Sequence, residues 1–181
     1  GIVEADLGRI KTLLDGVLGH SDYSDVQRMG GLTNRTYRVE FADGSRIMVR
    51  IPGEGTEEMI DRSDEKVSTQ LACKLGIDAK LYHFGDDGSK VSEFVPNAVT
   101  MCAETMREDK RIRQAARLLK KLHDCGEDTG IPFDVFDMAA GYEKIIRENN
   151  VPMYDDYDEI KTAVMEVKKH VDSVCDIKNV P

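Results

Sequence analysis

Apolar and polar side chains alternate with a period of two between residues 37 and 51. The alternation is interrupted at Asp43-Gly44, a dipeptide typical of β-hairpin turns. This pattern predicts two antiparallel strands that each bury one face. An earlier strand begins near Val26 and is separated from this pair by Gly30-Gly31. The apolar positions of the pair are Tyr37, Val39, Phe41, Ile47, Val49 and Ile51.

Helical spacing appears on both sides of these strands. Apolar residues recur every three or four positions over residues 4–18, and Gly19 ends the run. A second helix is expected from about residue 56 to residue 75, with Gly76 as its end. Its first residues are acidic, which the helix dipole favours.

The rest of the chain changes character at Pro96. Residues 81–84 and 91–95 are apolar enough to form two more strands, joined by a short turn. Beyond Pro96 the pattern is helical, with helices marked at residues 112–123 and 160–174. We therefore expect an α+β protein, in which a sheet of about five antiparallel strands carries a helix and is followed by a helical half.

Composition excludes several classes of partner. The formal charge is −9 and no block of Lys and Arg is present, so nucleic acid is not an expected partner. No apolar run is long enough to span a membrane and no signal-peptide pattern is seen, so we expect a cytoplasmic protein with a small-molecule substrate and no membrane partner. The four cysteines and four histidines are scattered without metal-ligand spacing, and no zinc site is predicted.

The turn formed by Gly30 and Gly31, followed by Thr33 and Asn34, has two interpretations. It can be a simple hairpin corner. Alternatively, its backbone N–H groups can approach a bound phosphate closely, because glycine has no side chain to block them.

Arg50 lies on the strand after this turn, and it also has two interpretations. It can face solvent, as alternating strand residues commonly do, or it can bind phosphate. The following helix carries Asp61 and Glu65, and either carboxylate could orient the guanidinium. We favour Glu65, with Asp61 as a solvated helix charge.

This order of elements matches the small lobe of a protein-kinase-like fold and the first helices of its large lobe. We place the lobe boundary between residues 1–95 and 96–181. In that fold a glycine-rich loop covers the ATP phosphates, a basic residue on the third strand binds them, and a helix carboxylate orients that residue. An arginine at this position points away from protein kinases, because its fork can bind phosphate and carboxylate oxygens together.

The same residues carry a resemblance to a known family. Several motifs in order resemble the amino-terminal half of choline/ethanolamine kinases, especially bacterial choline kinases, up to about residue 150. These motifs are Gly30-Gly31-Leu32-Thr33-Asn34, Val49-Arg50-Ile51-Pro52-Gly53-Glu54-Gly55-Thr56, Ile60-Asp61-Arg62 with Glu65, Leu75-Gly76-Ile77, residues 118–123, residues 133–137 and Tyr142-Glu143-Lys144.

The resemblance implies ATP-dependent phosphorylation of the choline hydroxyl, with magnesium. It implies that the glycine turn shelters the phosphates, that a basic residue held by a carboxylate binds them, and that the connection between the lobes binds adenine. Ile51 and Phe94 would flank the base, although each could instead be a core residue. The implied nucleotide-binding residues are Gly30, Gly31, Thr33, Asn34, Arg50, Ile51, Glu65, Glu93, Phe94 and Val95.

The chain departs from the family pattern at its carboxyl end. No His-x-Asp-x-x-x-x-Asn catalytic loop occurs, and the strand leading to it would begin near residues 179–181. On this interpretation the magnesium ligands and the catalytic base lie beyond residue 181. We therefore expect a fragment that is inactive by itself, binds ATP weakly or not at all, and self-associates through exposed helical surface.

Three alternatives to choline kinase remain open from the sequence. The substrate could be ethanolamine, or an aminoglycoside or another small alcohol. The chain could also be a non-catalytic nucleotide-binding or interaction module.

Overall fold

The structure, a computed structural model, describes residues 1–176. The chain divides into two compact units, residues 1–126 and the residues from 127 onward, and each is described by itself. The strand expected to begin near residues 179–181 lies outside the described residues.

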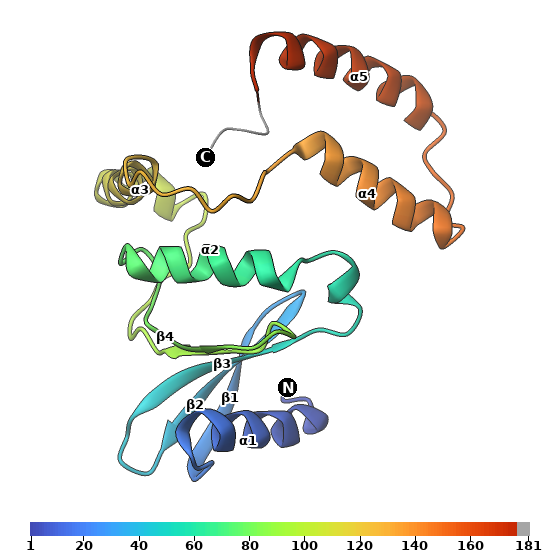
Figure 1. The fold of residues 1–181 in the computed structure, drawn as a ribbon. Helices are drawn as coiled ribbons and strands as arrows, with labels where there is room; N and C mark the ends of the chain where they lie inside the picture. The colour runs from blue at the N-terminus through green and yellow to red at the C-terminus, as the bar shows by residue number, and fades with distance from the viewer. Residues whose placement is uncertain (177–181) are drawn as a thin grey trace. The chain divides into compact units, whose positions relative to one another are not determined.

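The first unit is built on a five-stranded antiparallel sheet, as the alternating pattern predicted (Figure 1). Its strands are β1 (Tyr23–Gly30), β2 (Asn34–Phe41), β3 (Arg46–Pro52), β4 (Leu81–Phe84) and β5 (Lys90–Glu93). They lie in the order β1-β2-β3-β5-β4. Tyr37 pairs with Val49 across the hairpin, and this register keeps the apolar residues of both strands on one face.

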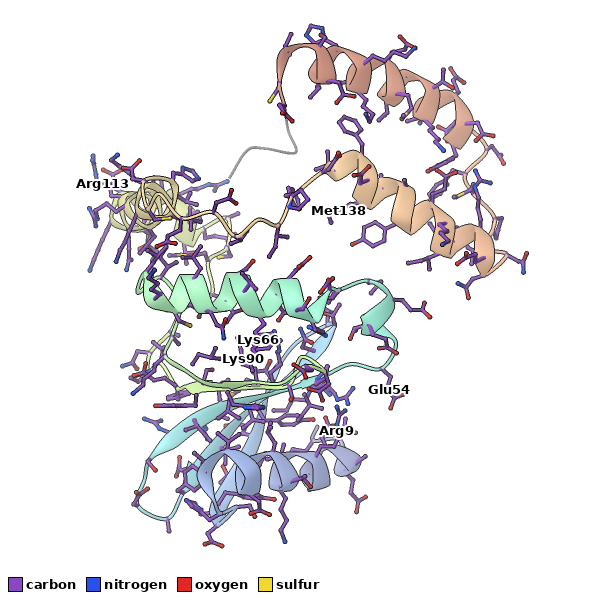
Figure 2. The ribbon with its side chains drawn as sticks, viewed as in Figure 1. Arg9, Glu54, Lys66, Lys90, Arg113 and Met138 are labelled. Carbon is purple, nitrogen blue, oxygen red and sulfur yellow. The ribbon has the colours of Figure 1, made fainter. Side chains whose placement is uncertain are left out.

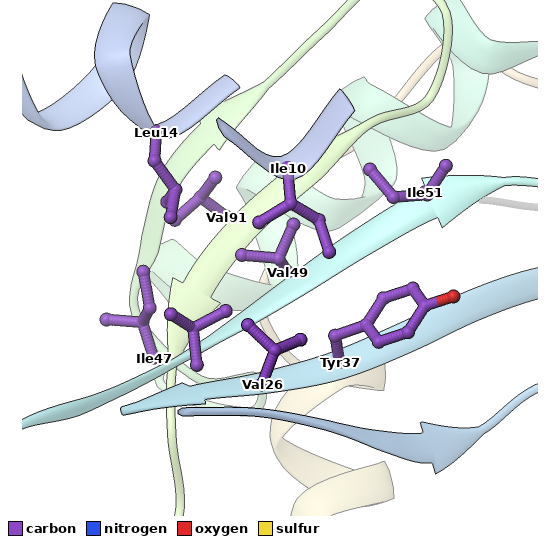
Figure 3. Packing of buried hydrophobic residues seen from close by; sticks show 9 residues of the cluster. Ile10, Leu14, Val26, Tyr37, Ile47, Val49, Ile51 and Val91 are labelled. Atoms are coloured by element: carbon purple, nitrogen blue, oxygen red, sulfur yellow. The ribbon is translucent and has the colours of Figure 1, made fainter. Parts of the chain in front are cut away.

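The hydrophobic core lies between this apolar face and α1 (Glu4–Leu18). Ile10 and Leu14 of the helix are fully buried against Val49 and Val91 of the sheet (Figure 3). Each such aliphatic side chain stabilises the fold by about 1.5–3 kcal/mol when it leaves water. The helix predicted over residues 4–18 is therefore confirmed, and its apolar stripe anchors it to the sheet.

A buried charge cluster joins α1 to the sheet beside this core. Asp6 accepts hydrogen bonds from Arg35 Nε (2.5 Å) and Nη2 (2.8 Å), and from the Tyr37 hydroxyl (2.5 Å). Only 1% of Asp6 is exposed. The arginine holds the pKa of Asp6 below its ordinary value, although burial opposes this shift.

Helix α2 (Arg62–Lys74) lies on the opposite face of the sheet from α1 (Figure 1). It begins later than the sequence pattern predicted. Asp61 caps it by accepting hydrogen bonds from the N–H groups of Ser63 and Asp64, which would otherwise have no partner. The acidic residues expected in its first turn belong instead to a short 3-10 turn, η1 (Thr56–Glu58).

The described helices beyond β5 are α3, α4 and α5. The first unit ends with η2 (Thr105–Arg107) and α3 (Asp109–His123). The second contains α4 (Val135–Glu148) and α5 (Tyr157–Val174). Glu143 of α4 accepts hydrogen bonds from the Tyr157 hydroxyl (3.0 Å) and from Lys161 Nζ (2.6 Å), which ties α4 to α5. Within residues 1–176, no helix combines the length and apolarity that crossing a membrane requires.

Candidate functional site

Arg50 is held on the α2 side of the sheet by two groups. Its Nε and Nη2 donate to the carbonyl of Gly88, at 3.1 and 2.8 Å, and Nη2 also forms an ion pair with Glu65 Oε1. Gly88 lies in the turn between β4 and β5. The predicted pairing of Arg50 with Glu65 is therefore confirmed, whereas Asp61 serves as the cap of α2.

Glu65 is shared between two arginines. Its Oε1 contacts Arg50, and its Oε2 accepts a hydrogen bond from Arg62 Nη1 at 2.6 Å. Since one carboxylate balances two guanidinium groups, these three side chains carry a net charge of about +1. This balance favours an anion beside Arg50.

Arg62 reaches two further segments through its second terminal nitrogen. Nη2 donates to Asn34 Oδ1 at the base of the glycine turn (3.0 Å) and to Thr56 Oγ1 in η1 (2.9 Å). Its guanidinium also lies against Gly88, so both arginines converge on the β4–β5 turn. We call Asn34, Arg50, Thr56, Arg62, Glu65 and Gly88 the double-arginine network.

Arg62 and Gly88 were not predicted from the sequence as parts of the site. A signal was present, because Arg62 and Glu65 are three residues apart on a helix and such pairs lie side by side. The contact with Gly88 comes from a distant turn, and no local pattern indicates it.

The glycine turn between β1 and β2 has a backbone that only glycine can adopt easily. Gly31 has φ of +112°, and a Cβ there would lie 1.7 Å from the carbonyl oxygen of Asn34. The N–H of Gly53 donates to the carbonyl of Thr33 at 2.9 Å, which fixes the turn to the end of β3. Leu32 is fully exposed at the tip. Of the predicted turn residues, Asn34 uses its side chain to bind Arg62.

A pocket of about 310 Å³ opens beside Arg50 on the α2 side of the sheet. This volume is at the lower end of the range of about 300–1,000 Å³ seen for small-molecule sites. Figure 2 shows one of its lining residues, Lys90, on this side of the sheet and Arg9 on the α1 side. The lining is formed by Met29, Thr36, Met48, Arg50, Ala79, Lys90, Ser92, Glu93, Phe94, Val95 and Ala98.

Three of the residues predicted to contact a base line this pocket: Glu93, Phe94 and Val95. The N–H of Glu93 already donates to the carbonyl of Lys80 (2.8 Å), so this N–H is not free to donate to a ligand. The Phe94 ring is covered by the Arg46 guanidinium, 4.6 Å from the ring centre.

The expectation for Ile51 is wrong. Ile51 is 1% exposed and belongs to the core under α1, with Ile10 and Val49. Ile51 follows Arg50 on β3, so its side chain points to the opposite, α1-facing side of the sheet, and Ile51 is not among the residues that line this pocket. Met48, two residues before Arg50, provides the apolar contact on the pocket side.

A magnesium site cannot be assigned in the part of the chain that the structure describes. No three Asp, Glu, His or Cys side chains of residues 1–176 come together as ligands.

The sheet has five antiparallel strands, a strand arginine pairs with a helix carboxylate, and a glycine turn lies beside a pocket. These features define the small lobe of a protein-kinase-like fold. The comparisons with known proteins narrow this class. The sequence profile of choline/ethanolamine kinases matches residues 26–179, so the chain belongs to the choline/ethanolamine kinase family.

The similar proteins support the same family and fold. A probable ethanolamine kinase from Arabidopsis thaliana is 32% identical over 112 residues, which are 60% of this chain and 29% of that protein. The crystal structure of choline kinase LicA from Streptococcus pneumoniae matches 94% of this chain with a TM-score of 0.78 and 26% identity. LicA in complex with AMP matches 92% of this chain with a TM-score of 0.75 and 26% identity.

The chain is considerably shorter than these relatives. It covers 58% of the LicA chain, 57% of the LicA chain in the AMP complex, and 29% of the Arabidopsis protein.

Proposed function

We propose that this chain forms the ATP-binding half of a kinase that transfers the γ-phosphoryl group of ATP to the hydroxyl of choline. One observation carries the proposal: Arg50, paired with Glu65, lines a pocket next to the glycine turn. LicA, a similar protein, forms a complex with AMP, which supports a nucleotide as the ligand.

The residues proposed to contact the base, and Arg50, all line the pocket. The base would lie among Met48, Phe94 and Val95, and the carbonyl of Glu93 would accept a hydrogen bond from it. The phosphates would extend toward Arg50, whose Nε and Nη2 are engaged by Gly88 and Glu65. Nη1 of Arg50 then provides two N–H donors for phosphate oxygens.

The backbone N–H groups of Gly30, Gly31 and Thr33 would cover the phosphates from the side of the turn. Positioning and charge neutralisation are the main contributions that proteins make to phosphoryl transfer. The described residues can contribute both, and ATP itself supplies the transferred group.

Choline is proposed as the acceptor because the overall likeness to choline kinase LicA extends over nearly the whole chain. Ethanolamine is the second candidate, favoured by the Arabidopsis relative. An ADP-release assay on the complete gene product with choline, ethanolamine and an aminoglycoside distinguishes them. We expect choline to give the highest kcat/KM; no stimulation by choline would contradict the proposal.

For residues 1–181 alone, we expect nucleotide affinity weaker than micromolar. An affinity of about 1 mM corresponds to only about 4 kcal/mol of binding free energy, which NMR titration can still follow. Shifts of the amides of Arg50, Ser92 and Val95 on addition of ADP would support binding in the pocket. A micromolar dissociation constant measured by calorimetry would contradict the expectation of weak nucleotide binding.

Self-association through the exposed helical surface stays a prediction, and light scattering can test it.

A further inference from the structure

We propose that Arg62 is a positioning residue for the nucleotide phosphates. This inference rests on the proposed function, because it assigns Arg62 a role in the same site. Arg62 does not line the pocket. Arg62 would instead act on neighbouring groups, because it fixes the positions of the glycine turn, η1 and Glu65 relative to one another.

The burial of Arg62 indicates a role inside the fold. Its side chain is 6% exposed, less than the 13% of Arg50. A buried guanidinium is costly unless its donors are satisfied. Nη1 donates to Glu65, and both donors of Nη2 are taken by Asn34 and Thr56, while Nε is buried without a hydrogen-bond partner.

The three acceptors of Arg62 belong to three different segments. Asn34 begins β2 directly after the glycine turn, Thr56 lies after β3, and Glu65 lies on α2. A planar guanidinium can hold three acceptors in a fixed arrangement, whereas a lysine presents a single nitrogen on a flexible stem. The geometry therefore favours arginine at this position.

Loss of Arg62 would change the phosphate site in two ways. Asn34 would lose its link to α2, so the glycine turn would be less well placed over the phosphates. Glu65 would lose one of its two cations and would neutralise Arg50 more completely, which reduces the attraction for an anion. Neither change reaches the residues proposed to contact the base.

This difference gives a specific test. Arg62→Met and Arg62→Lys are compared with the wild-type chain by NMR titration with ADP and with adenosine. We expect ADP affinity to fall about tenfold or more, as for other losses of charged hydrogen bonds, while adenosine affinity changes less than about twofold. If the role of Arg62 is purely structural, its loss should lower the affinities for ADP and adenosine by the same factor.

Asp6→Asn is the matched control. It disrupts a buried arginine–carboxylate pair under α1, on the other face of the sheet, so it destabilises the same unit without touching the pocket. We expect its ratio of ADP to adenosine affinity to equal that of the wild type. If Arg62→Met does not fold, Asn34→Ala and Thr56→Val each remove one hydrogen bond of Arg62 and take its place.

The outcomes separate the two proposals. If the wild-type chain shows no preference for ADP over adenosine, the proposed phosphate site is wrong. If the wild type prefers ADP and the Arg62 variants, or their two replacements, keep that preference, the positioning role of Arg62 is wrong and the proposed function stands.

Discussion

Gly88 lies so close to Arg62 that a Cβ on Gly88 would be 2.5 Å from Nε of the arginine. Its φ is +90°, a conformation that L side chains rarely adopt. Because Gly88 also provides the carbonyl that holds Arg50, this turn residue brings the two arginines of the double-arginine network together.

Substitution of Gly88 by alanine is expected to destabilise the first unit by two mechanisms. The positive φ costs about 1–2 kcal/mol for a residue with a Cβ. Displacement of the buried arginine adds about 1–3 kcal/mol, as overpacking does elsewhere. Urea denaturation measures the combined loss in the free energy of unfolding.

Gly44→Ala is the control for this substitution. Gly44 has φ of +82° in the β2–β3 turn, and a Cβ there meets nothing within 4 Å. Gly44→Ala should therefore show only the destabilisation that the positive φ causes. If Gly44→Ala and Gly88→Ala lower the free energy of unfolding by the same amount, the close contact between Gly88 and Arg62 is contradicted.

Arg50→Lys tests whether the site needs a guanidinium. Lysine has one nitrogen, and it cannot contact the Gly88 carbonyl, Glu65 and a phosphate with the planar geometry of arginine. We expect ADP affinity to fall about tenfold, equivalent to about 1.4 kcal/mol. NMR titration of the variant chain measures it.

Arg111→Lys serves as the control for the loss of a guanidinium. Arg111 pairs with Glu108 beside the start of α3, and the pair is partly exposed to solvent. We expect unchanged ADP affinity. If Arg50→Lys also binds ADP as well as the wild type, the proposed phosphate contact of Arg50 is wrong.

Asp6 is expected to make the stability of the first unit depend on pH. The hydrogen bond from Arg35 lowers the pKa of Asp6 in the folded state, with a further contribution from the Tyr37 hydroxyl. The stabilisation is therefore fully present above the ordinary aspartate pKa of about 4 and is lost as the pH falls through the lower pKa of the folded state.

Asp6→Asn isolates this contribution. At neutral pH it should lower the free energy of unfolding by about 3 kcal/mol, because it leaves a largely buried arginine without its charge partner. The difference in the free energy of unfolding between wild type and variant should narrow as the pH falls from about 4 toward the lower pKa of folded Asp6, where the wild-type carboxylate loses its charge. Asp25→Asn removes a carboxylate that is 61% exposed and lies 3.7 Å from Arg38, so it should cost less than about 1 kcal/mol. A gap that stays constant with pH would contradict the role of the Asp6 charge.

The sheet was predictable because its information is local. Alternation over residues 37–51 and one hairpin turn determine which face is buried, and the observed pairing of Tyr37 with Val49 follows from them. The pairing of Arg50 with Glu65 was predictable as well. Arg50 lies on the strand before the helix that carries Glu65, and the two side chains meet because α2 packs on the Arg50 face of the sheet.

Other features were missed for identifiable reasons. Ile51 was assigned to the base through the family resemblance, although the period of two already places it opposite Arg50. The start of α2 was placed at Thr56 because acidic residues follow it, but the capping side chain of Asp61 determines the start.

Helix α4 was not predicted as a separate helix from the sequence pattern. Its apolar residues Val135, Met138, Tyr142 and Ile145 have helical spacing, and Asp134 caps it, but Gly141 weakens its intrinsic helix propensity. The Arg62 contacts could not be read from sequence, because their partners come from segments that only the tertiary fold brings together.

In the second unit, Glu143 is expected to control the packing of α5 on α4. Hydrogen bonds from Lys161 and Arg147, with a smaller contribution from Tyr157, hold its pKa at about 2. The ordinary value is 4.5, so the stabilising charge is fully present above about pH 4.5 and is lost as the pH falls toward 2.

Glu143→Gln should therefore weaken the protection of α5 amides against hydrogen exchange at neutral pH, because Lys161 of α5 loses its ionic partner on α4. In the wild type the same loss should appear only in acid, between the two pKa values. Glu166→Gln removes a carboxylate that pairs with Lys169 within α5 alone, and it should leave this protection unchanged. If α5 protection in the Glu143→Gln variant equals that of the wild type at neutral pH, the contact between Glu143 and Lys161 does not hold the two helices together.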